Sequence, residues 1–284
     1  MIFSSDGLQW TADEPNLVTG LKGLVGAEIK IIGPMTDQHS GLHGGAIANP
    51  LMALSQLVAS MKDSNGKITI DGFYDDVLEL GDEERADIAR VPYDEEAYIK
   101  ELKVTGLHGE EGYSTRERLW ARPTLDVNGI FGGYQGMGSK TVHPSEASVK
   151  ITCRLVSNQS PEIIYNLICR HVDKHLPVGV KSEVQQLAGS ADPFVMPRSH
   201  NANQVAREIL EEVYDMEPYV TRVGGSIPIM TIFLKELGVY GTMFGFSVGD
   251  ENLHAPNEFF RLKNFIRGQE AYCKLFERLG GKSF

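Results

Sequence analysis

The sequence has few cysteines and no long apolar run. Its 284 residues include only Cys153, Cys169 and Cys273, with no C-x-x-C pair, which excludes a disulfide framework and a cysteine-rich zinc site. We therefore expect reduced thiols and a cytoplasmic protein. No apolar stretch is long enough to span a bilayer, and the first residues lack the basic and apolar regions of a signal peptide.

Positive charge is also scarce. Lysine and arginine total 27 against 38 aspartate and glutamate residues, so the formal net charge is −11. Without a basic stripe to neutralise phosphates, we expect neither nucleic acid nor a membrane as a partner. By contrast, 42% of the residues are hydrophobic and 23% are charged. This balance is typical of a globular protein with a substantial core, and the length suits two domains.

The middle of the chain predicts an α+β unit. Alternation of apolar and polar residues indicates strands, and apolar residues at helical spacing indicate helices. Strands are predicted at residues 22–34, 67–73, 124–130, 148–156 and 180–187, and helices at residues 49–62 and 160–175. Two strand–helix–strand units suit an antiparallel four-stranded sheet with two helices on one face, the ferredoxin-like fold. Residues 82–103, rich in Asp, Glu and Arg, predict short exposed helices.

From about residue 195 helices and strands alternate. Helices are predicted at residues 201–214, 227–237 and 257–279, and strands at residues 219–223 and 239–246. This alternation predicts an α/β layer with a mostly parallel sheet. The expected fold class is therefore α/β plus α+β.

Residues 37–45 (DQHSGLHGG) pack two histidines and three glycines between a predicted strand and a predicted helix. Such a turn is a common way to hold an imidazole at the edge of a site. It is equally typical of a loop in which the glycines supply positive φ and His39 is a hydrogen-bonded turn residue. The residues alone leave both interpretations open.

Two further loops follow predicted strands of the C-terminal region, where parallel sheets gather ligands. Gly224-Gly225-Ser226 precedes a helix, so its N–H groups suit a carboxylate, although a simple N-cap turn is the more common use of a Gly-Ser pair. His254 lies in an acidic loop bounded by proline. Its neutral imidazole suits a metal, and a surface loop histidine is the alternative.

A set of short motifs occurs in order along nearly the whole chain. The motifs are Ser5-Asp6-Gly7, GLKG at 20–23, DQHSGLHGG at 37–45, NP at 49–50, GFYDDV at 72–77, KTVHP at 140–144, RLVSNQSPE at 154–162, GGSIP at 224–228 and HAPNE at 254–258. Together they resemble the carnosinase-type dipeptidases of the aminoacylase/carnosinase family of di-zinc metallopeptidases. The resemblance implies an α/β catalytic domain interrupted by a ferredoxin-like lid that forms a homodimer.

On this basis the chain divides into three parts. Residues 1–19 are expected to be a remnant of the catalytic domain, residues 20–194 the lid and dimerisation domain, and residues 195–284 the C-terminal half of the catalytic α/β domain. The resemblance further implies that Asp6 binds one zinc ion and His254 the other. It implies that His39 reaches into the neighbouring subunit's site and helps to stabilise the tetrahedral oxyanion, where a hydrogen-bond donor contributes several kcal/mol.

The resemblance also implies a substrate site. Thr141, Arg154, His200 and Ser226 would hold the substrate, with Arg154 binding the free carboxylate of a dipeptide through two N–H groups. Without the resemblance, Arg154 is an ordinary outward charge on a strand, His200 is a neighbour of a helix start, and Thr141 is a loop residue.

Part of the family's metal site is missing from the sequence. The family's H-x-D motif, its bridging aspartate and its Glu-Glu pair lie upstream of S-D, and none is present here. Asp6 and His254 would serve different zinc ions, whereas catalytic zinc usually has three protein ligands. We therefore expect a truncated, inactive C-terminal portion of a dipeptidase that uses two zinc ions, or manganese, in its complete form. The alternatives are a non-catalytic protein that pairs through the lid and an N-acyl-amino-acid amidohydrolase of the same family.

Overall fold

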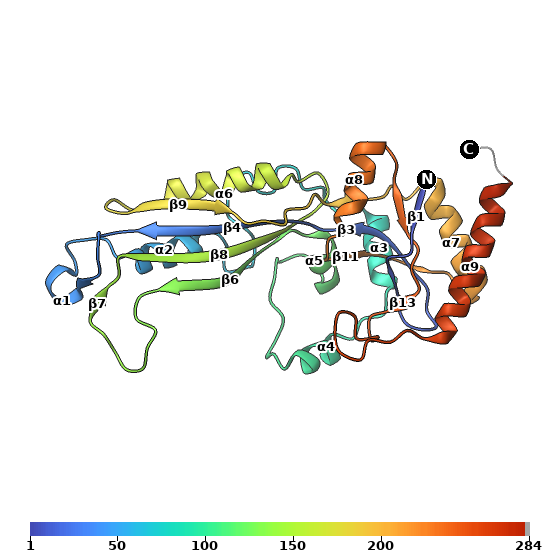
Figure 1. The fold of residues 1–284 in the computed structure, drawn as a ribbon, viewed down its shortest axis with the longest axis horizontal. Coiled ribbons are helices and arrows are strands. Elements are labelled where there is room, and N and C mark those ends of the chain that lie inside the picture. The colour runs from blue at the N-terminus through green and yellow to red at the C-terminus, as the bar shows by residue number, and fades with distance from the viewer. Residues whose placement is uncertain (282–284) are drawn as a thin grey trace.

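A four-stranded antiparallel sheet forms a long arm of the molecule, which a computed structural model describes over residues 1–281 (Figure 1). Its strands are β4 (Gly23–Ile32), β6 (Thr124–Gly132), β8 (Glu146–Leu155) and β9 (Lys181–Gln186). Their order is β6-β8-β4-β9, and β4 pairs with β8 along its whole length. The strand order and the antiparallel pairing confirm the predicted ferredoxin-like sheet.

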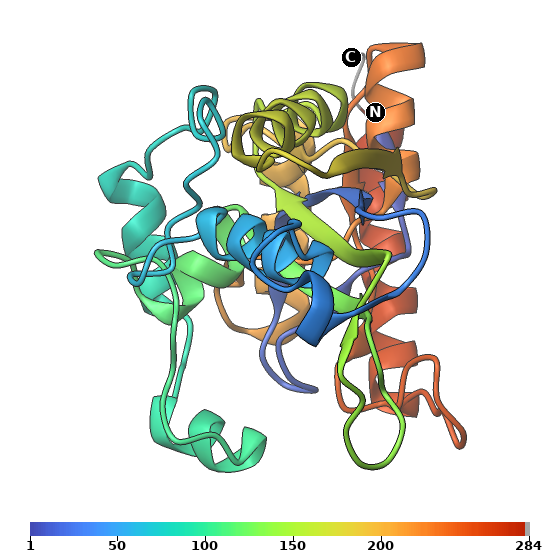
Figure 2. The same cartoon turned by 90° about the vertical axis from the view of Figure 1, so that its left-hand side faces the viewer.

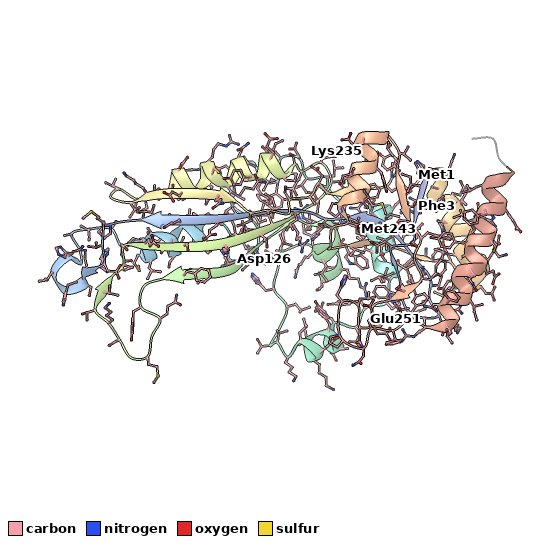
Figure 3. All side chains as sticks on the ribbon, viewed as in Figure 1. Met1, Phe3, Asp126, Lys235, Met243 and Glu251 are labelled. Atoms are coloured by element: carbon pink, nitrogen blue, oxygen red, sulfur yellow. The ribbon has the colours of Figure 1, made fainter. Side chains whose placement is uncertain are left out.

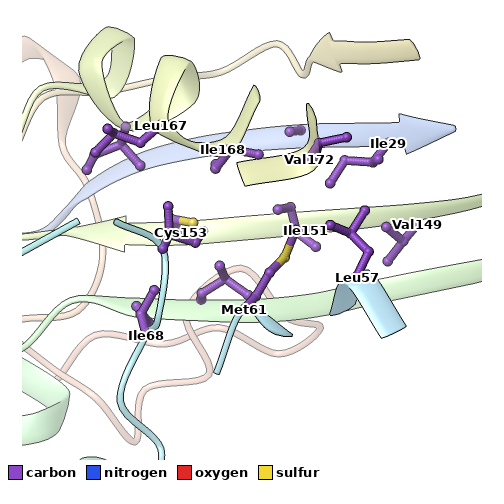
Figure 4. Close-up of a cluster of buried hydrophobic side chains, with 14 of the residues drawn as sticks. Ile29, Leu57, Met61, Ile68, Val149, Ile151, Cys153, Leu167, Ile168 and Val172 are labelled. Carbon is purple, nitrogen blue, oxygen red and sulfur yellow. The ribbon is translucent and has the colours of Figure 1, made fainter. Parts of the chain in front are cut away.

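Two helices cover one face of this sheet. They are α2 (Pro50–Ser60) and α6 (Pro161–His175). Alternate residues of β8, such as Ile151 and Cys153, are buried beneath the helices together with Leu57 and Ile168 (Figure 4). Burying a side chain such as leucine or isoleucine contributes about 1.5–3 kcal/mol. The alternation that predicted these strands is therefore the pattern that builds the core of the arm.

Residues 67–73 do not form a strand of the sheet, so that prediction is wrong. Within the described residues, the pairing in this segment is an isolated bridge between Lys62 and Ile68. Ile68, Ile70 and Phe73 are instead buried in the core on the helix side of the sheet. The hydroxyl of Tyr74 accepts a hydrogen bond from the N–H of Ile68 at 3.2 Å. An irregular buried segment thus shows the same alternation as a strand.

The second part of the molecule is a layer of short, mostly parallel strands, as predicted. The parallel pairs are β1 (Ile2–Ser4) with β12 (Gly241–Met243), β2 (Leu8–Gln9) with β13 (Ser247–Val248), and β3 (Asn16–Leu21) with β11 (Tyr219–Val223). On its other side, β3 pairs antiparallel with β10 (Phe194–Val195). The helices are α7 (Asn201–Tyr214), α8 (Pro228–Leu237) and α9 (Leu262–Gly280). Leu17 of β3 clusters with α7 and α9, whereas Val18 clusters with Met230 of α8. Because neighbouring strand residues face opposite sides, helices cover both faces.

Two elements of this layer are shorter than predicted. The strand expected over residues 239–246 is limited to β12, and β13 begins after that range at Ser247. At Gly245 the backbone passes so close to Gly7 that a Cβ atom would lie 2.4 Å from the Gly7 carbonyl oxygen. The helix expected from residue 257 begins at Leu262. The segment before it is held as a loop because the buried carboxylate of Glu251 accepts a hydrogen bond from the N–H of Arg261 at 3.1 Å.

The remaining elements lie at the junction and at the tip of the arm. Residues 82–103 form α3 (Asp82–Arg90) and α4 (Glu95–Leu102), as predicted, and α5 (Thr115–Ala121) follows. Figure 2 shows α4 extending away from the body of the molecule. The tip contains β5 (Gln38–His39), α1 (Ser40–His43) and β7 (Val142–His143). Among residues 1–281, no helix combines the length and the apolar character needed to cross a membrane.

Candidate functional site

The tip of the arm brings two of the predicted site residues together. Strands β5 and β7 pair antiparallel, and His39 lies opposite Val142. Thr141, which precedes Val142 in the chain, therefore lies close to His39. The Ser40 N–H donates a hydrogen bond to the Thr141 carbonyl at 3.0 Å. His39 and Thr141 are both exposed. An imidazole and a hydroxyl from distant parts of the sequence therefore share one exposed surface.

The turn that follows His39 fixes its ring. The Nδ1 atom accepts a hydrogen bond from the Gly41 N–H at 3.0 Å, so the neutral ring carries its hydrogen on Nε2. A Cβ atom at position 41 would lie 2.9 Å from the ring, so glycine leaves room for this arrangement. The exposed edge of the ring is consequently an N–H donor, which suits a developing negative charge.

A second pair of predicted residues meets where the arm joins the parallel layer. Arg154 belongs to β8, and Ser226 lies in the loop between β11 and α8. The Arg154 Nη1 lies 3.5 Å from the Ser226 Oγ. The neighbour of Arg154, Cys153, is buried beneath the helices, so Arg154 faces the opposite, open side of the sheet. The structure thus brings a guanidinium and a hydroxyl together across the junction.

Lys22 completes this junction and was not among the residues predicted from the sequence. It lies between β3 and β4, and its side chain is only 3% exposed. Its Nζ donates a hydrogen bond to the Arg118 carbonyl at 3.0 Å, and its own carbonyl accepts one from the Ser226 hydroxyl at 2.6 Å. Burial is the main reason that the pKa of Lys22 is lowered to about 7; the charge of Arg154 adds to the decrease and that of Asp126 opposes it. The GLKG motif gave no sign that its lysine is buried. Figure 3 shows Asp126 on the edge of the arm near α5.

His200 lies in a different place. It caps the start of α7, where its Nδ1 accepts a hydrogen bond from the Ala202 N–H at 3.2 Å. Its ring centroid is 5.3 Å from that of Tyr240, and both residues line an open groove beside Met1. Over residues 1–281, His200 makes no hydrogen bond to Arg154 or Ser226. The structure therefore does not bring His200 together with the pair at the junction.

Asp6 and His254, the predicted metal ligands, are exposed loop residues. Asp6 follows β1, and His254 lies in the loop after β13 with a left-handed φ of 60°. A carboxylate and an imidazole are suitable zinc donors. However, no group of three or more His, Cys, Asp or Glu side chains suited to a metal ion occurs in the part of the chain that the structure describes. The residues present therefore do not fit a complete zinc site.

A ferredoxin-like arm inserted into a mostly parallel α/β layer defines a lid-bearing peptidase fold. The family described as the Peptidase dimerisation domain, of the M20 peptidases, matches residues 19–180. The chain belongs to the M20 metallopeptidases, in the carnosinase-type dipeptidase group.

Individual relatives agree with this assignment. The Cys-Gly metallodipeptidase of Candida albicans is 33% identical over 98% of this chain and 56% of its own length. The Beta-Ala-His dipeptidase of Rattus norvegicus is 27% identical over 98% of this chain and 57% of its own. An M20 family metallo-carboxypeptidase of Sulfolobus solfataricus superimposes with a TM-score of 0.81 at 31% identity, over 97% of this chain and 63% of that one. The chain thus spans little more than half the length of these dipeptidase relatives.

Proposed function

We propose that this chain is the lid and the C-terminal portion of a metallodipeptidase whose complete site uses two zinc ions to hydrolyse dipeptides. The observation that carries the proposal is the meeting of Arg154 and Ser226 at the junction of an M20 dimerisation domain and its α/β layer. Relatives named for Cys-Gly and Beta-Ala-His indicate small substrates with a free carboxylate. Asp6 and His254 would each hold one metal ion, and the other ligands would lie outside the described residues.

Arg154 and Ser226 would bind the free carboxylate of the dipeptide. A guanidinium offers two parallel N–H donors to a carboxylate, and the Ser226 hydroxyl lies beside it. The loop that carries Ser226 leads into α8, whose N-terminal end favours negative charge. His200 would contact another part of the substrate, and Thr141, which lies beside His39 at the tip of the arm, would do so in the site of a partner subunit.

His39 would act in the site of a partner subunit. Strand β4 alone extends over 10 residues, about 33 Å at 3.3 Å per residue, and His39 lies beyond its far end (Figure 1). Asp6, Ser226 and His254 all belong to the layer at the opposite end of the molecule. A homodimer through the lid would therefore be needed to bring the Nε2–H donor of His39 to the scissile carbonyl, where it would stabilise the oxyanion.

A chimera tests the proposed activity. This chain replaces the matching part of the Candida albicans Cys-Gly metallodipeptidase, and hydrolysis of Cys-Gly is measured beside hydrolysis of N-acetylglycine. We expect chelator-sensitive hydrolysis of the dipeptide, lost about 100-fold or more in kcat with His39→Ala, as for removal of an oxyanion donor. A folded chimera that cleaves only the N-acyl amino acid would favour an amidohydrolase instead. A folded chimera with neither activity would contradict the proposal.

The incomplete set of metal ligands supports a second candidate, a non-catalytic protein that pairs through the lid. Elemental analysis of the purified chain after dialysis, together with sedimentation, tests this candidate. We expect less than one zinc ion per chain, a dimer in solution and no hydrolysis by the chain alone. Two zinc ions per chain with chelator-sensitive hydrolysis would show that the chain is active by itself. A strictly monomeric chain would remove the basis of the pairing function.

Two further proposals concern the organisation and the cellular compartment. We place the boundaries of the lid at residues 20 and 194, which lie near the end of β3 and at the start of β10. The family match over residues 19–180 supports the first boundary. Cys153, Cys169 and Cys273 are free thiols, which supports a reducing, cytoplasmic environment.

A further inference from the structure

Lys22 is a buried lysine to which the proposed roles above give no task. We propose that Lys22 is a positioning residue of the carboxylate site, which takes up a proton from solvent when a carboxylate binds Arg154 and Ser226. The protonated ammonium then adds a second positive charge behind the ligand. This inference rests on the proposed function, because it takes Arg154 and Ser226 as the site of the substrate carboxylate.

The contacts of Lys22 tie it to the loop that carries Ser226. Its backbone N–H donates to the Val223 carbonyl at 3.1 Å, and its carbonyl accepts from the Ser226 hydroxyl at 2.6 Å. The same hydroxyl lies 3.5 Å from the Arg154 Nη1. A ligand that reaches the Ser226 oxygen is therefore one hydrogen bond away from the Lys22 backbone.

The two guanidinium groups near Lys22 differ in their partners: over residues 1–281 Arg154 has no ion pair with a carboxylate, whereas Arg122 is paired with Glu110 at 2.7 Å. Within the same residues, the hydrogen-bond acceptor of the Lys22 Nζ is the Arg118 carbonyl, and no carboxylate forms an ion pair with it. The charged groups that act on Lys22 are Arg154 of β8, Arg122 after α5, and Asp126 of β6. The Asp126 carboxylate accepts a hydrogen bond from the Thr124 hydroxyl at 3.0 Å. Arg154 therefore supplies the unpaired positive charge that acts on the buried Lys22 amine, and Asp126 opposes it.

This environment makes the protonation of Lys22 sensitive to an added anion. Burial, Arg154 and Arg122 lower its pKa to about 7, so near neutral pH the ammonium and the neutral amine are both present. A carboxylate beside Arg154 would offset the guanidinium charge that acts on Lys22. The amine would then bind a proton from solvent, and by linkage the protonated enzyme would hold the carboxylate more tightly.

The alternative is that Lys22 only joins β3, β4 and α5 at the junction. A purely structural lysine would keep the same pKa with and without ligand. The test is to follow the ε-methylene NMR signal of Lys22 against pH, assigned by its loss in Lys22→Arg. The full chain is titrated alone, with glycylglycine, and with glycylglycinamide, which lacks the carboxylate.

We expect the titration midpoint of Lys22 to rise by about one pH unit with glycylglycine and to stay unchanged with the amide, because an opposite charge nearby raises a lysine pKa. Arg154→Met should raise the midpoint without ligand and abolish the response. Lys22→Arg should keep glycylglycine binding but lose its dependence on pH between about pH 6 and about pH 8.

Two results would overturn the inference, and they are distinguishable. If glycylglycine perturbs the Arg154 and Ser226 signals but leaves the Lys22 midpoint unchanged, Lys22 has no role in binding, and the proposed carboxylate site stands. If glycylglycine perturbs none of the three residues, the carboxylate site itself is refuted. The activity of the chimera reports separately on whether the chain belongs to a dipeptidase.

Discussion

His171 gives a quantitative prediction about the stability of the lid in acid. The side chain lies on α6 and is only 4% exposed. Its Nε2 is 2.9 Å from the Ser60 Oγ, and the Ser60 hydroxyl donates to the Leu57 carbonyl, so His171 Nε2 carries the hydrogen of this contact. The His175 ring stacks on it with centroids 4.0 Å apart. Protonation would thus place a charge on a buried, stacked ring.

The magnitude follows from the pKa. Burial is the main reason that the pKa of His171 is lowered from 6.5 to about 4, and His175 adds to the decrease. Each pKa unit corresponds to about 1.36 kcal/mol, so the difference amounts to about 3 kcal/mol. The unfolded chain binds more protons than the folded chain between these two pKa values. The free energy of unfolding should therefore fall as the pH is lowered from about 6.5 to about 4.

The assay compares urea unfolding of the wild type and His171→Phe at about pH 7 and about pH 4, with the exposed His43→Gln as the control. Other groups titrate in both proteins, so the difference between them isolates His171. Relative to the variant, the wild type should lose about 3 kcal/mol over this range, whereas His43→Gln should parallel the wild type. Equal acid destabilisation of the wild type and His171→Phe would refute the reasoning.

Three further predictions concern stability. Lys22→Met should raise the free energy of unfolding at about pH 6 by at most about 5 kcal/mol, because the folded protein then no longer buries a charged ammonium. The folded-state pKa of Lys22 is lowered, so the extra stability of the variant should disappear as the pH rises from about 7 towards 10.5. Urea unfolding measured against pH tests this. Ile168→Ala, at a fully buried position, should cost about 2–5 kcal/mol in the same assay, and a loss below 1 kcal/mol would show that the core collapses around the cavity. Gly66→Ala should lower the thermal midpoint, because φ is 79° and the new Cβ would lie 2.7 Å from the Gly109 backbone. Gly106→Ala, in a loop with open space around it, should leave the midpoint nearly unchanged.

The arm was predictable because local sequence patterns report its core directly. In β8, the buried Val149, Ile151 and Cys153 alternate with half-buried polar residues, so the strand and its buried face could both be predicted. The same signal was misleading at residues 67–73, where Ile68 and Ile70 are buried without entering the sheet. Local alternation reports burial, whereas strand pairing depends on partners elsewhere in the chain.

The candidate site was predictable residue by residue through the resemblance, but its arrangement was not. Thr141 comes next to His39 through the pairing of β5 and β7, and Arg154 meets Ser226 only after the arm docks on the parallel layer. Both contacts join segments that are remote in sequence. Lys22 was missed because burial of a charged residue between two strands depends on α5 and the Ser226 loop, which pack over it.

The length of the arm has a genetic consequence if His39 serves a partner's site. A chain carrying His39→Ala keeps its own Arg154 and Ser226, whereas a chain carrying Arg154→Ala still offers an intact His39 at its tip (Figure 1). In a mixed dimer, one site would contain both lesions and the other would contain neither. In the complete enzyme, two inactive alleles should therefore complement each other in one cell and restore up to half of the sites in each mixed dimer.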